Sequence, residues 1–149
     1  MEVKKKLISF CRDWVAERIS VAQIAMDNAQ AAANEEGKSS AGDKYETGRA
    51  MMQIERDKAA QQLEEARKLK QIVDGLNEAA QTDMVRLGSI VQTKRYQFFI
   101  AISIGKISMD GVDYLFVSPQ SPVGKSLLNK KRGEHILFNQ TEEQIHRIR

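Results

Sequence analysis

The chain has 149 residues, 42% hydrophobic but only 6% aromatic, which is enough for one ordinary domain or two small ones with a modest core. Its net charge of +3 comes from residues 79–149, which contain ten Lys and Arg but only six Asp and Glu. This surplus is compatible with binding to nucleic acid or to an acidic protein surface but proves neither. The single cysteine excludes an internal disulfide and a thiolate zinc cluster, and the apolar run "FFIAISI" is too short to span a bilayer, so we expect a cytoplasmic protein without membrane contact.

Residues 7–34 contain neither glycine nor proline and carry a stripe of apolar residues at heptad spacing. The stripe consists of Ile8, Val15, Ile19, Ala22, Met26, Ala29 and Ala33. This spacing predicts a long helix that packs against a second helix along the stripe. The stripe shrinks to alanine toward residue 34, which allows the two backbones to approach closely.

The segment "NEEGKSSAGDKYETG" at 34–48 interrupts this pattern with glycines, serines and four carboxylates. A second stripe follows, weaker because it includes one Glu and one Gln: Tyr45, Gly48, Met52, Glu55, Ala59, Gln62, Ala66, Leu69, Val73 and Leu76. Two helices of similar length joined by a short loop predict an antiparallel coiled-coil hairpin over residues 1–78, with an acidic tip at 34–48. Each arm would extend about 45 Å at the rise of an α-helix.

After residue 78 the pattern changes to short runs of β-branched and aromatic residues separated by turn signals such as Asp110-Gly111. Between the last two runs, Ser121 can cap a helix, Pro122 suits its first turn, and the helix would continue to Lys130. Residues 79–149 are therefore predicted to form a small α+β domain with a bent antiparallel sheet and one short helix.

Enzyme signatures find little support in the chain. "GKS" at 124–126 lacks the glycine of a phosphate-binding loop, since Pro119 occupies that position. Neither His135 nor His146 has a second ligand type at metal-site spacing, and no nucleophile turn accompanies the Ser, His and Asp residues. We expect a protein that is no enzyme and holds no metal of its own.

The densest basic cluster after residue 78 is "NKKRGE", with Lys130, Lys131 and Arg132. It is either a solvated turn or a docking contact to phosphates or to an acidic protein. No aromatic residues alternate with these charges, which argues against a stacking platform for single strands.

The run "SPQSPVGKSLLNKKRGEHILF" resembles the signature of the Gre-type bacterial transcription elongation factors, as do Gly88 with "SIVQT" and Gly105-Lys106-Ile107. The resemblance implies an FKBP-like C-terminal domain that docks on RNA polymerase, and a hairpin that enters the polymerase secondary channel. Acidic tip residues would there help to hold a magnesium ion that belongs to the polymerase. The factor would contact nucleic acid, DNA included, only within the transcription complex, and would stimulate cleavage of backtracked RNA by the polymerase itself.

The tip departs from the family pattern. When Tyr45 is placed on the family's tyrosine, its two acidic positions fall on Lys38 and Ala41. Asp43 and Glu46, three apart on one helical face, are our candidates for a substitute pair. The same spacing is also that of a capping box, so these acids alternatively cap the second helix.

The remaining candidates are residues that would contact a partner. They are Glu35 and Glu36 at the tip, and Ser121, Lys125, Lys130, Lys131 and Arg132 in the C-terminal domain. Two other functions stay open: a regulator that occupies the polymerase channel without promoting cleavage, and a coiled-coil adaptor unrelated to transcription. Prolyl isomerase activity would rest on fold analogy alone.

Overall fold

The computed structural model describes residues 2–36, 42–79 and 81–149, except for the side chains of residues 36 and 42–46. Its elements follow one another as α1 (Glu2–Glu36), α2 (Gly42–Asp74), β1 (Ile90–Gln92), β2 (Gln97–Ile100), β3 (Gly105–Met109), β4 (Val112–Val117), α3 (Pro122–Leu127), β5 (His135–Phe138), β6 (Thr141–Gln144) and β7 (Arg147–Ile148). Residues 12–71 form one compact unit, and residues 1–11 with 72–149 form the other.

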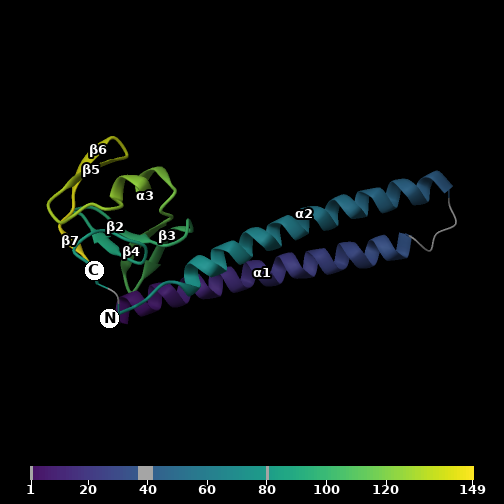
Figure 1. Ribbon diagram of the computed structural model, residues 1–149, viewed down its shortest axis with the longest axis horizontal. Coiled ribbons are helices and arrows are strands. Elements are labelled where there is room, and N and C mark those ends of the chain that lie inside the picture. The colour runs from purple at the N-terminus through teal and green to yellow at the C-terminus, as the bar shows by residue number, and fades with distance from the viewer. Residues whose placement is uncertain (1, 37–41, 80) are drawn as a thin grey trace. The chain divides into compact units, whose positions relative to one another are not determined.

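The first unit is a helical hairpin in which α1 and α2 run side by side in opposite directions (Figure 1). On α1 the heptad stripe is confirmed, because Val15, Ala22 and Ala29 are buried at intervals of seven. Alanine at two of these three positions lets the helices lie close together, as the sequence predicted.

On α2 the buried stripe differs from the predicted one. Ala59 and Ala66 are buried as expected, but Glu55 and Gln62 are exposed. Between Ala59 and Ala66, the buried residue of the seam is Leu63 instead of Gln62. A Leu at that position removes more apolar surface from water than a Gln, which favours a helix rotated toward Leu63.

The second unit contains a five-stranded sheet in the order β3-β4-β2-β1-β7 and a separate two-stranded pair, β5-β6. The predicted α+β class with one short helix is confirmed, but the sheet is mixed rather than wholly antiparallel, because β2 and β4 pair in parallel. After β2 the chain first forms the edge strand β3 and then turns at Asp110 and Gly111, whose φ values are 52° and 80°. It returns as β4, which lies between β3 and β2.

Both faces of β2 are buried, which explains its unbroken apolar run. Phe98 and Ile100 belong to a core with Leu127 and Ile145. Phe99, between them, points to the opposite face, where its ring lies 5.4 Å from that of Phe116. The Phe116 ring in turn lies 5.6 Å from that of Phe10 in α1, so the early turns of α1 belong to this unit.

Candidate functional site

The hairpin tip brings acidic residues to the ends of both helices. Glu35 lies in the last turn of α1 and its side chain is exposed. Asp43 and Glu46 lie in the first turns of α2, three residues apart. The side chains of Glu36, Asp43 and Glu46 lie outside the described residues, as do Lys38 and Ala41.

The two helix ends at the tip differ in their electrostatics. Acids in the first turn of α2 are favoured by the positive end of the helix dipole, and because α2 begins at Gly42, Asp43 lies inside that turn rather than at the N-cap position. The last turn of α1 carries Glu35 and Glu36 and no basic residue, so two carboxylates stand at the negative end of that helix. The helix dipole therefore favours the acids at the start of α2 but not those at the end of α1, where Glu35 also interacts with another group of the protein.

Within the part of the chain that the structure describes, no group of three or more His, Cys, Asp and Glu residues could hold a metal ion. Magnesium is commonly held by one or two protein carboxylates together with phosphate and water. Carboxylates at the tip could therefore supply some of the ligands of a magnesium site that another molecule completes.

In the second unit, Ser121 caps α3. Its hydroxyl donates to the Ser118 carbonyl oxygen at 2.7 Å and accepts from the Gly124 amide at 3.1 Å. The helix begins at Pro122 as predicted but ends at Leu127, before Lys130. Both hydrogen bonds of the Ser121 hydroxyl are therefore made within this turn. The side chain of Lys125, on α3, is exposed.

Lys131 and Arg132 are exposed and line an open groove of about 540 Å³. The other lining residues are Thr82, Asp83, His146, Arg147 and Ile148. Lys130 is half-buried beside this groove, and its carbonyl accepts from the amide of Val85 at 2.8 Å. We call this feature the basic groove.

Backbone hydrogen bonds hold the two walls of the basic groove in place. The Asn129 amide donates to Val85 at 3.0 Å, and Met84 pairs with Lys131 as an isolated bridge. On the other wall, the His146 amide donates to Gln92 at 2.8 Å, which fixes the residue before β7 against β1. Segments far apart in sequence are thus brought to one surface.

The basic groove includes two residues that the sequence did not identify as candidates. Neither His146 nor Arg147 stands in a motif that predicts a binding role. The only sequence signal was the basic run "HRIR" at 146–149. Three permanent cations, one histidine and one carboxylate line the groove, which suits phosphate or carboxylate groups of a partner.

Comparison of the sequence with protein-family models and with curated proteins finds no match. Among the described residues, no helix has the length and hydropathy needed to cross a membrane. Any assignment of function therefore depends on the sequence motifs and on the geometry of the tip and the basic groove.

Proposed function

We propose that this protein is a Gre-type elongation factor that binds bacterial RNA polymerase, inserts its hairpin into the secondary channel and stimulates cleavage of backtracked RNA. The observation that carries the proposal is the hairpin end itself. Glu35 and Glu36 close α1 against the helix dipole, and Asp43 and Glu46 open α2. Four carboxylates gathered at the end of a long hairpin can be presented together to a metal ion that another molecule holds, because magnesium is commonly bound by one or two protein carboxylates with phosphate and water.

In this proposal the chain contributes carboxylates and the polymerase contributes the rest of the active site. A magnesium ion bound there would stabilise the attacking and leaving oxygens of phosphodiester hydrolysis. Asp43 and Glu46 would hold one side of that ion's coordination shell, and the hairpin would carry them to it. The protein is then no enzyme by itself and binds no cofactor outside the complex.

The second unit would be the docking domain, with the FKBP-like fold that the resemblance implies. Lys131, Arg132 and Arg147 give the basic groove its positive charge. Such a surface fits acidic side chains of a protein partner or phosphates of nucleic acid within the complex.

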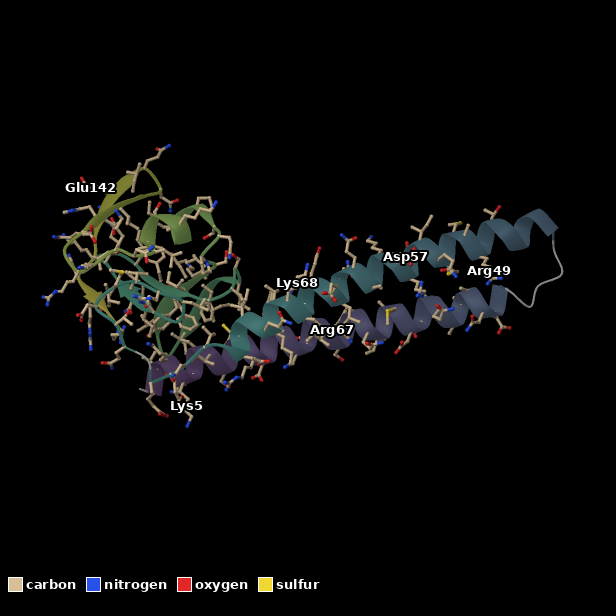
Figure 2. All side chains as sticks on the ribbon, in the orientation of Figure 1. Lys5, Arg49, Asp57, Arg67, Lys68 and Glu142 are labelled. Atoms are coloured by element: carbon tan, nitrogen blue, oxygen red, sulfur yellow. The ribbon has the colours of Figure 1, made fainter. Side chains whose placement is uncertain are left out.

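The tip is tested with a double variant, Asp43→Ala with Glu46→Ala, in a cleavage assay on stalled RNA polymerase. We expect stimulated cleavage to fall by about tenfold or more, because a lost metal ligand or charge stabiliser typically costs at least that much. The matched control is Asp57→Ala with Glu64→Ala, two exposed acids on α2 away from the tip; Asp57 is labelled in Figure 2. Full cleavage by the tip variant together with retained polymerase binding would remove the metal role of this pair.

A regulator that occupies the channel without cleavage is the second candidate. Lys38 and Ala41 stand where the family pattern has its acids, which favours this reading. It predicts that the unmutated protein slows elongation and competes with a cleavage factor but releases no RNA fragment. Fragment release by the unmutated protein alone rejects it.

The coiled-coil adaptor unrelated to transcription makes a different prediction. It requires that immobilised full-length protein retains no RNA polymerase. The proposal instead predicts retention that is lost when Lys131→Glu and Arg132→Glu reverse the charge of the basic groove, and kept when Lys5→Glu and Arg12→Glu change two exposed cations of α1.

A further inference from the structure

One face of the hairpin exposes large hydrophobic side chains. Val21 and Ile24 on α1 are 61% and 56% exposed, and Met51 and Ile54 on α2 are 58% and 66% exposed. At 3.6 residues per turn, all four lie on the same side of their helices, turned away from the buried seam residues Ala22 and Leu63. Among the described residues of the hairpin, no other large hydrophobic side chain is exposed to this degree.

Two open grooves run along this same face. The first, of about 570 Å³, lies between residues 14–22 of α1 and residues 62–69 of α2. The second, of about 420 Å³, lies between residues 25–32 and residues 52–62. Gln62 lines both, so the grooves meet at a level between Ala22 and Ala25 on α1 and at Gln62 on α2.

Several residues on this face are placed symmetrically about a midpoint of each helix. On α1, Val21 and Ile24 lie at equal distances in sequence from a midpoint between residues 22 and 23. On α2, Lys58 and Glu65 lie at equal distances from a midpoint at residues 61–62, and Ile54 and Leu69 lie at equal distances farther out. In these three pairs, reversing the direction of each helix exchanges a hydrophobic residue with a hydrophobic one and a cation with an anion.

The two midpoints lie at the level where the grooves meet. One two-fold axis, perpendicular to the helices and parallel to the plane of the hairpin, can therefore pass both midpoints. It sets α1 antiparallel to α1 and α2 antiparallel to α2, with Val21 opposite Ile24 and Lys58 opposite Glu65. A parallel pairing would instead set α1 on α2 at equal level, so that Val21 and Ile24 meet the polar neighbourhood of Gln62.

We propose that this face of the hairpin, lined by Val21, Ile24, Ile54, Lys58 and Glu65, binds a second copy of this chain in the antiparallel arrangement. The result is a four-helix bundle in which the exposed hydrophobic residues form a second core layer. This proposal does not rest on the proposed function, because the interface uses the side of the hairpin rather than its tip or the basic groove.

Sedimentation equilibrium of the full-length protein tests the interface. We expect a dimer whose dissociation constant rises at least about tenfold in Ile24→Glu, since two glutamates then replace two central hydrophobic contacts. The control, Ala16→Glu, adds the same charge at an exposed position of α1 on another face. Helix content by circular dichroism reports whether each variant folds. A monomer at all concentrations, or equal weakening by both variants, overturns the proposal.

Disulfide cross-linking tests the antiparallel register. Two single variants, Lys58→Cys and Glu65→Cys, are mixed and oxidised, while the native Cys11 stays silent because it is buried with a raised pKa. We expect the mixed 58–65 disulfide to form faster than either the 58–58 or the 65–65 disulfide. Like-with-like disulfides, or none at a concentration where the protein sediments as a dimer, contradict the register.

Restoring the charge pair provides a second test of register. Lys58→Glu alone sets like charges opposite each other and should weaken the dimer, whereas Lys58→Glu combined with Glu65→Lys exchanges the pair and should restore it. Equal dissociation constants for the single and double variants would contradict the antiparallel pairing.

Discussion

At the scale of single residues, Gly124 is the position in α3 with the least freedom to change. A Cβ atom added there would lie 1.9 Å from the carbonyl oxygen of Ser118, the same oxygen that accepts from the Ser121 hydroxyl. The sequence predicted the Ser121 cap from residue types alone. It did not identify Gly124 as constrained, because the obstacle comes from the backbone of the preceding turn and has no sequence motif.

Gly124→Ala is expected to destabilise the protein by about 1–3 kcal/mol, the usual cost of inserting an atom where the backbone leaves no room. Urea unfolding followed by circular dichroism measures this. Gly111→Ala is the control, because its added Cβ meets nothing within 4 Å and only its positive φ of 80° opposes the change, at roughly 1 kcal/mol. A Gly124 variant as stable as the Gly111 variant would contradict the steric account.

Cys11 offers a second residue-scale prediction. Burial raises the pKa of its thiol from 9.0 to about 12. At pH 8 the folded protein should then hold on the order of one thiolate in ten thousand, against about one in ten when unfolded, so a thiol reagent should react slowly until urea is added. Because the folded pKa lies above the unfolded value, its contribution to stability is complete below pH 9 and is lost as the pH rises toward 12. Rapid labelling of the native protein would contradict this burial.

At the scale of elements, the hairpin shows what periodicity can and cannot decide. On α1 a single heptad stripe existed, and it is the buried one. On α2 two neighbouring stripes share Ala59 and Ala66, and the sequence interpretation followed Gln62 where the structure buries Leu63. The choice depends on the rotation of α2 against α1, which a stripe in one helix does not determine.

Leu63→Ala should cost about 2–5 kcal/mol in unfolding free energy, because a buried leucine leaves a cavity. Gln62→Ala should stay within about 0.5 kcal/mol, because its side chain is exposed and alanine is a good helix former. Thermal or urea unfolding of the two variants distinguishes the seams. A larger loss for Gln62→Ala would restore the stripe that the sequence first indicated.

The sheet makes the same point for topology. The runs of strand type and the turn at Asp110-Gly111 were predictable from residue types. The parallel pairing of β2 with β4 was not, because it arises when β3 takes the edge and leaves β4 to insert beside β2. The basic groove was not predictable either, because Lys131 and Arg132 are brought to His146 and Arg147 by long-range pairing, of Met84 with Lys131 and of β1 with β7.

At the scale of the whole molecule, the proposals assign different surfaces to different partners. The tip acids and the basic groove are assigned to the polymerase, and the apolar side of the hairpin to a second copy of the chain. If both proposals hold, a hairpin inside a narrow channel has no room for its copy. Raising the polymerase concentration should then convert dimer to polymerase-bound monomer, which light scattering detects.

The measurement that tests the central claim most directly is retention of bacterial RNA polymerase by the full-length protein, immobilised through a tag and washed at moderate salt. Polymerase binding through the basic groove predicts strong retention by the unmutated protein and by the tip variant Asp43→Ala with Glu46→Ala. It predicts loss of retention in Lys131→Glu with Arg132→Glu. No retention by the unmutated protein, or equal retention by all three proteins, would contradict the account.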